Sequence, residues 1–158
     1  MRTSNHRARA IVAALAASLV LVTVIGPVAA AEPKPQPVTI VSDMAVVGLP
    51  HNLGTFDTVR GPICASGTVA DTRLVLLKGE FETDFVLTVN KTFTCDDKSG
   101  TFFARLLVRM SGSVETFTWV ILGGTGRYHD LFGLGSGSTE PFEGGGGVTN
   151  TYTGYLVH

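Results

Sequence analysis

The chain has 158 residues, 44% of them hydrophobic and 16% charged, and its formal net charge is −1. Lys and Arg are spread along the sequence without a basic run. Binding to nucleic acid or to an anionic membrane surface is therefore not expected, because both require a concentration of positive charge. The length suits a targeting segment followed by one domain with a single core.

Residues 1–31 are predicted to be a signal peptide. Three arginines precede the apolar run Ala10–Ile25, and small residues ending at Ala31 follow it. The run has 16 residues, fewer than the roughly 20 that span a bilayer. An uncleaved membrane anchor is the alternative, but no stop-transfer pattern follows. We therefore expect cleavage after Ala31 or Ala30, a secreted, extracellular protein, and no stable membrane span.

Residues 32–37 carry proline at alternate positions and are predicted to form an extended, solvated spacer. The domain is then expected to span residues 38–158. Without the signal peptide the chain keeps nine Lys and Arg against 13 Asp and Glu, a net charge of −4. Hydrophobic and polar residues alternate along the domain, which predicts strands and no helix of any length.

Several strands are predicted in the first half of the domain. They are Val38–Val47, Cys64–Ala70 and Arg73–Lys78. Leu49–Pro62 is predicted to be a long connection, and whether it contains a short strand at Thr55–Arg60 is left open. The alternation is clearest in Asp84–Cys95, where one face is apolar except for Lys91. It resumes over Thr101–Met110 and Glu115–Leu122. The apolar faces of these three strands predict the core residues Phe85, Leu87, Val89, Phe102, Leu106, Val108, Phe117, Trp119 and Ile121.

Two cysteines, Cys64 and Cys95, lie in the predicted domain. An even number of cysteines in an exported chain favours a disulfide, and two allow one pairing. A metal pair or a catalytic thiol is the alternative, but neither cysteine has a CxxC partner or a histidine nearby in sequence. We predict a structural disulfide.

A glycine-rich segment follows the strand that ends at Leu122. Gly123, Gly124, Thr125 and Gly126 are predicted to form a tight turn into a second strand, Arg127–Ser138. Gly133, Gly135 and Gly137 alternate along that strand, so three side chains are missing from one face. A strand needs this where a backbone, a bend or a barrel corner comes too close for a Cβ.

A last strand is predicted over Thr149–Val157, which brings the number of strands to about eight. Antiparallel strands at this spacing fit either a small barrel or a sandwich. The alternating glycines favour the barrel, because closure requires coiled strands and close corners. The predicted fold class is therefore all-β, a single antiparallel barrel.

The glycine segment also resembles a known family. Its Leu122–Tyr128 stretch and the following Gly133–Leu134–Gly135 are similar to the Gly-Gly-Thr-Gly turn and glycine-bearing strand of allene oxide cyclase and dirigent-type barrels. Tyr152–Thr153–Gly154 and Ser66–Gly67–Thr68 resemble segments of secreted bacterial proteins with this calycin-like barrel.

This resemblance implies an antiparallel barrel of about eight strands, often trimeric, with an apolar lumen and no cofactor. The cyclase members close a fatty-acid-derived epoxide, and the dirigent members direct the coupling of phenolic radicals. The catalytic residues of the family lie outside the glycine motif, and none of them corresponds to a position in this sequence.

Tyr128, His129 and Asp130 are the candidate catalytic segment. In a strand, Tyr128 and Asp130 would share one face and His129 the other. On a lumen face, Asp130 beside Tyr128 would be a carboxylic acid with a raised pKa, suited to protonating a substrate oxygen. The alternative is a solvent face with ordinary charges.

Other candidate sites are weaker. Arg105, Arg109 and Glu115 are candidates for binding a substrate, but the core face lies opposite the arginines. An outward Arg109–Glu115 ion pair across the hairpin is the favoured alternative. No metal-ligand spacing occurs among the histidines and carboxylates, and the glycine turn lacks the third glycine of a dinucleotide fingerprint. No metal or cofactor is therefore predicted.

The sequence thus favours a secreted barrel that binds a small, largely apolar molecule, with cofactor-free cyclase or isomerase activity implied only by the resemblance. The alternative is a non-enzymatic module that acts through its surface, because small barrels can be filled by their own side chains.

Overall fold

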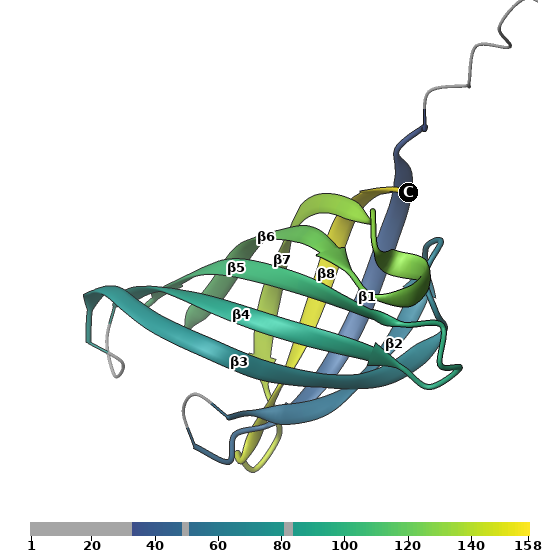
Figure 1. Cartoon of the computed structure of the whole chain (residues 1–158). Coiled ribbons are helices and arrows are strands. Elements are labelled where there is room, and N and C mark those ends of the chain that lie inside the picture. Colours follow the sequence, from purple (N-terminus) through teal and green to yellow (C-terminus); the bar gives the residue numbers. More distant parts are fainter. Residues whose placement is uncertain (1–32, 49–50, 81–83) are drawn as a thin grey trace, which may run out of the picture. The chain divides into compact units, whose positions relative to one another are not determined.

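The computed structural model describes residues 33–48, 51–80 and 84–158, so the predicted signal peptide lies outside the described residues. The described chain forms one closed antiparallel barrel (Figure 1). Its eight strands are β1 (Gln36–Ala45), β2 (Leu53–Arg60), β3 (Ser66–Gly79), β4 (Phe85–Cys95), β5 (Thr101–Ser111), β6 (Val114–Gly124), β7 (Phe132–Pro141) and β8 (Gly147–Val157). Each strand pairs with its neighbours in sequence, and β1 also pairs with β8. The predicted barrel is confirmed, and the sandwich is excluded.

The strand boundaries differ from expectation in the first half of the domain. The two short strands predicted on either side of Asp71 are one strand, β3, because Asp71 itself pairs with Lys91 of β4 and a bulge before Arg73 absorbs the irregularity. The short strand in the first connection is present as β2. The spacer is shorter than predicted, since β1 already begins at Gln36.

The glycine segment is not a tight hairpin turn. Gly123 and Gly124 end β6, and Thr125 precedes a single 3-10 turn, η1 (Gly126–Tyr128). The next strand, β7, begins only at Phe132. Tyr128, the last residue of this turn, is fully buried and its hydroxyl accepts a hydrogen bond from the backbone N–H of Cys64. These tertiary contacts favour the turn over a continuous hairpin.

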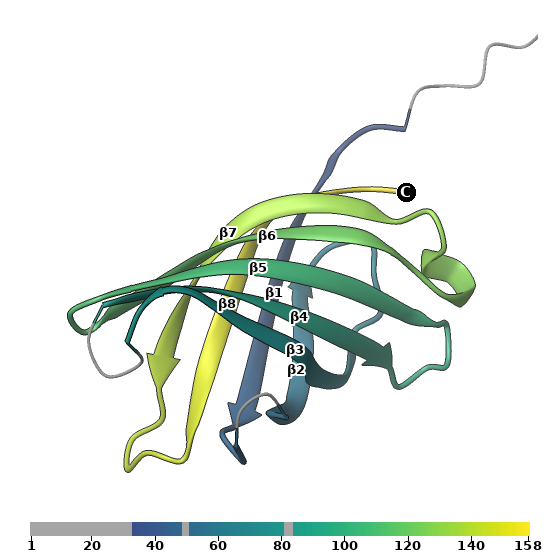
Figure 2. The same ribbon diagram turned by 60° about the vertical axis from the view of Figure 1, so that its left-hand side comes forward.

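The connections divide the barrel into two ends (Figure 2). The β4–β5 turn, η1 and the C-terminus lie at one end, which we call the closed end. The β5–β6 and β7–β8 connections lie at the other, which we call the open end.

The core is the inside of the barrel. All nine residues of the predicted core are buried, none of them more than 8% exposed. The predicted disulfide between Cys64 and Cys95 is present and ties the segment before β3 to the end of β4, with the two Cα atoms 5.9 Å apart.

Candidate functional site in the barrel lumen

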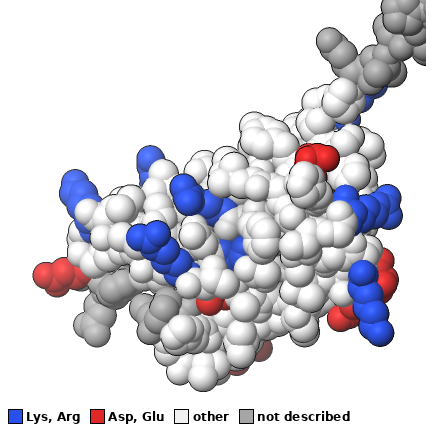
Figure 3. Space-filling view, in the orientation of Figure 1, with Lys and Arg blue, Asp and Glu red and all other residues white. Residues whose placement is uncertain are grey.

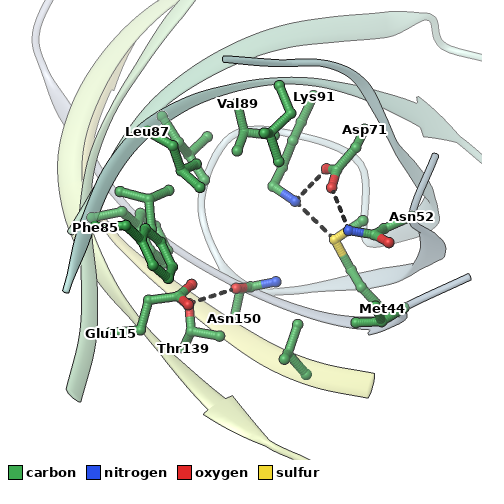
Figure 4. A pocket seen from close by; sticks show the side chains of 16 residues that line it. Met44, Asn52, Asp71, Phe85, Leu87, Val89, Lys91, Glu115, Thr139 and Asn150 are labelled. Atoms are coloured by element: carbon green, nitrogen blue, oxygen red, sulfur yellow. Dashed lines mark hydrogen bonds and ion pairs between the residues drawn. The ribbon is translucent and has the colours of Figure 1, made fainter. Parts of the chain in front are cut away.

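An ion pair lies inside the barrel near the middle of β4 (Figure 4). Lys91 Nζ is 2.6 Å from Asp71 Oδ1, and the two side chains are only 6% and 4% exposed. Residues at alternate positions of β4 face inward, and Lys91 occupies one of these positions between Val89 and Phe93. The one charged residue on the apolar face of this strand is therefore a lumen residue.

Strand pairing positions the two charges. Asp71 and Lys91 are directly opposite each other in the β3–β4 register. Lys91 Nζ also donates to Met44 Sδ at 2.9 Å, while Asn52 Nδ2 donates to Asp71 Oδ2 at 3.0 Å. Each Asp71 oxygen thus accepts a hydrogen bond, as a buried carboxylate requires.

Burial sets the acid–base behaviour of this lysine. Desolvation lowers the pKa of Lys91 below its usual value, and the nearby carboxylates of Asp71 and Glu115 only partly oppose this shift. The amine is therefore more often neutral than a lysine in water. A neutral amine is both a nucleophile and a base.

A cavity of about 210 Å³ adjoins the ion pair. It lies toward the open end, and aliphatic and aromatic side chains form most of its wall: Met44, Val46, Leu74, Phe85, Leu87, Val89, Leu106, Val108, Phe117 and Val148. It exceeds the roughly 150 Å³ cavity that binds benzene. By proportion, a molecule of about eight non-hydrogen atoms fits.

The polar part of the wall has a second group, separate from the ion pair in Figure 4. Thr139 Oγ1 donates to Asn150 Oδ1 at 2.9 Å, and the half-buried Glu115 lies beside them. Among the described residues, the charged side chains that line the cavity are Asp71, Lys91 and Glu115, two carboxylates against one ammonium.

The lumen toward the closed end is filled. Phe93 and Phe102 are stacked with ring centroids 4.7 Å apart, and Phe56 packs edge-on against both. Tyr152 packs edge-on against Phe93 from β8. The residual space beside Phe93, Phe102 and Tyr152 is only about 10 Å³, at the lower limit of what one water molecule needs. The accessible part of the lumen is therefore the half that contains Lys91.

The structure places Tyr128 at the closed end, away from the cavity. Its hydroxyl accepts a hydrogen bond from the backbone N–H of Cys64 at 2.9 Å and lies 3.0 Å from Ser99 Oγ. Its ring packs edge-on against Phe102. Tyr128 thus plugs the barrel next to the disulfide.

Asp130 does not share a face with Tyr128, because the segment is a turn instead of the predicted strand. Its side chain is 87% exposed, and its carboxylate lies 2.7 Å from Nδ1 of His129, whose side chain is 80% exposed. Of the two positions considered for Asp130, the structure has the solvent face and not the lumen. The geometry therefore does not bring the two candidate catalytic residues together.

The predicted Arg109–Glu115 pairing is also wrong. In the β5–β6 register, Glu115 lies opposite Met110, so it belongs to the inner face, while Arg109 lies opposite Thr116. Arg105 and Arg109 point outward as expected, and Arg105 Nε donates to Asn90 Oδ1 at 3.2 Å.

Strand pairing gathers positive charge that is dispersed in the sequence. The exposed side chains of Arg73, Lys78, Arg105 and Arg109 lie on the outer face of β3–β5, where Asn90 separates Arg73 from Arg105 and Val86 separates Lys78 from Arg109. Figure 3 shows Lys and Arg side chains gathered over this face. The sequence suggested that Lys and Arg are dispersed over the protein, but on this face of the barrel they are gathered.

The lumen ion pair is the feature that sequence reasoning missed. Its signal was present, because Lys91 is the one interruption of an apolar strand face. A buried lysine requires a partner of opposite charge. Asp71 lies between two predicted strands, so the sequence does not indicate whether its side chain points into the barrel or toward solvent.

Among residues 33–48, 51–80 and 84–158, no cluster of three His, Cys, Asp or Glu side chains has the geometry of a metal site. The described residues also contain no helix with the length and apolarity needed to cross a membrane. Compared with protein-family models and with curated proteins, the sequence matches none.

Proposed function

We propose that this protein is exported and that its lumen cavity binds a small, largely apolar molecule carrying one neutral oxygen acceptor. The observation that carries the proposal is the half-filled lumen, in which an apolar cavity of about 210 Å³ adjoins the Lys91 ammonium. Small-molecule sites combine mostly apolar walls with a few placed polar groups.

The hydrogen-bonding capacity of Lys91 supports an acceptor on the ligand. An ammonium group has three N–H donors. Among the described residues, Lys91 directs them at Asp71 and Met44, which leaves one donor for a third partner. A carbonyl or hydroxyl oxygen in the cavity is a suitable acceptor.

The charge of the wall disfavours an anionic ligand. Among the described residues of the wall, Asp71 and Glu115 together outweigh Lys91, so a ligand carboxylate would add to an excess of negative charge in an apolar cavity. A neutral oxygen avoids the cost of burying an unpaired charge.

Two features support export. Residues 1–31 have the pattern of a signal peptide, and the chain holds a disulfide, which persists in oxidising compartments.

The resemblance to allene oxide cyclase and dirigent-type barrels supports the same site. A closed barrel with an apolar cavity has the architecture that the resemblance implies for a cofactor-free cyclase or isomerase. We keep that activity, and a trimeric assembly, as proposals. The competing hypothesis, a protein that acts through its surface, requires a lumen filled by side chains. The lumen is filled in this way only toward the closed end.

Binding can be tested with 4-fluorobenzyl alcohol, whose ring suits the cavity and whose hydroxyl can accept from Lys91. Fluorine NMR should show line broadening on addition of the protein. Val108→Phe fills the cavity wall and should abolish the broadening, whereas Leu107→Phe, on the outer face of the same strand, should preserve it. Broadening that is absent from wild type, or equal in both variants, would overturn the proposal in favour of a surface-acting protein.

A further inference from the structure

We propose that Lys91 is a carbonyl-reactive amine that forms a Schiff base with small aldehydes bound in the lumen, and that Asp71 transfers the proton. This inference rests on the proposed function, because it requires that a small molecule enters the cavity. It goes further by assigning the ligand's oxygen to a carbonyl and giving the buried ion pair a chemical role.

The geometry provides a nucleophile at the surface of an apolar cavity. Lys91 lines the cavity, and Figure 4 shows its amine directed toward the interior together with Asp71. A carbonyl that accepts the remaining N–H of Lys91 has its carbon next to the nitrogen. Holding the two groups in this way removes much of the entropic barrier to their reaction.

Burial shifts the Lys91 amine toward its neutral, nucleophilic form, and Asp71 is placed to take up the proton that the ammonium releases. Burial lowers the pKa of Lys91, as it does for the lysines that enzymes use to form imines. Asp71 Oδ1, at 2.6 Å, is the acceptor for the proton that the ammonium must lose.

The step balances without a further reactant. The ammonium of Lys91 gives one proton to the Asp71 carboxylate, and the freed lone pair forms a bond to the carbonyl carbon. A second proton moves from nitrogen to the former carbonyl oxygen. Asp71 then returns its proton to that oxygen, which leaves as water when the C–O bond breaks. The product is a protonated imine, so the Asp71 carboxylate again faces a cation.

The stability of the fold does not explain why a charged pair occupies this position. Replacing a buried ion pair with well-packed apolar residues is often neutral or stabilising. Lys91 and Asp71 are also not enclosed by packed side chains, because both adjoin the cavity. The Lys91 side chain is only 6% exposed, and low exposure to water favours an imine over its hydrolysis.

Reductive trapping tests the proposal in the unmodified protein. The protein is treated near pH 7 with 4-fluorobenzaldehyde and sodium cyanoborohydride, which supplies the hydride that reduces the imine to a stable amine. Peptide mapping then gives the labelling rate of each lysine. Lys91 should be labelled at least about tenfold faster than Lys78 and Lys98, which are exposed and lie outside the cavity.

Two controls connect labelling to the cavity. Excess 4-fluorobenzyl alcohol, which has no carbonyl, should slow labelling of Lys91 and leave Lys78 and Lys98 unchanged. Val108→Phe should do the same, and Leu107→Phe should have no effect.

The outcomes separate this inference from the proposed function. If the alcohol binds but Lys91 is labelled no faster than the exposed lysines, the Schiff base is excluded and the binding function stands. If Lys91 is labelled fast but the alcohol does not compete, the reaction does not use the cavity and the inference fails. If neither binding nor labelling occurs, both proposals fail.

Discussion

The indole of Trp119 lies over the backbone of Gly135, in the space where any other residue would place its side chain. A Cβ on Gly135 would come within 2.5 Å of Trp119 Cζ2 and 2.0 Å of the Thr153 carbonyl oxygen. The two residues are opposite each other in the β6–β7 register. Gly137 has the same relationship to Phe117, the next inward residue of β6. The alternating glycines therefore make room for aromatic rings within the barrel.

Gly135→Ala should destabilise the protein by at least about 1–3 kcal/mol, because the methyl group overpacks a filled region and meets backbone as well as indole. Chemical denaturation followed by Trp119 fluorescence measures the loss. Ser136→Ala is the matched control, since its side chain points outward on the same strand, and it should change stability by less than about 0.5 kcal/mol. Equal effects of the two variants would contradict this account of Gly135.

The sequence was sufficient to predict the strands because they are amphipathic, and its alternating glycines favoured a barrel over a sandwich. Alternation is a local signal, and it identified the inward residues of β4, β5 and β6. The glycines of β7 indicated a close approach, but not that Trp119 would make it, because that depends on the β6–β7 register. Register is a property of the assembled sheet.

The candidate site could not be predicted for the same reason. Lys91 and Asp71 are 20 positions apart and meet only through β3–β4 pairing, which a bulge displaces just after Asp71. Tyr128 was predicted to lie in a strand, because tyrosine is common in strands, but it lies in the turn η1. Its burial against Phe102 and its hydrogen bond to Cys64 are tertiary contacts that override local preference.

The disulfide should contribute substantially to stability. It closes a loop with a sequence separation of 31, for which chain entropy gives about 3–4 kcal/mol. Reduction, or the double substitution Cys64→Ala and Cys95→Ala, should lower the free energy of unfolding by about that amount. Thiol titration of the denatured, unreduced protein should find no free thiol. Two titratable thiols per chain would show that the bond does not form.

Removing one partner of the lumen ion pair should lower the free energy of unfolding more than removing both partners. Lys91→Met leaves the Asp71 carboxylate buried without its cation and should cost about 3–5 kcal/mol of unfolding free energy. Adding Asp71→Leu should recover at least half of that loss, because no buried charge then remains at the pair. Urea denaturation of the single and double variants measures the coupling.

The exposed His129–Asp130 pair is the control for this cycle. Asp130→Asn should leave the denaturation midpoint unchanged, because both side chains are in solvent. A double lumen variant that is no more stable than Lys91→Met alone would show that the pair is not the source of the loss.

Tyr152 should limit the stability of the barrel at high pH. Its hydroxyl is buried and, within the described part of the chain, makes no hydrogen bond of acceptable geometry. Burial raises the pKa of Tyr152 above its ordinary value of 10.0, and Ser42 opposes this only in part. Below pH 10 both the folded and the unfolded states keep the proton. Above it the unfolded state loses the proton first, so the free energy of unfolding falls by up to about 1.4 kcal/mol per pH unit.

Tyr152→Phe should remove this alkaline loss. At pH 7 the variant should be as stable as wild type or more stable by up to about 1 kcal/mol, because a buried hydroxyl without a partner is removed. Urea denaturation at pH 7 and at about pH 11 compares the two proteins. Tyr155→Phe, on the exposed outer face of β8, should leave the alkaline loss in place. If Tyr152→Phe loses stability with pH as steeply as wild type, ionisation of Tyr152 is not its cause.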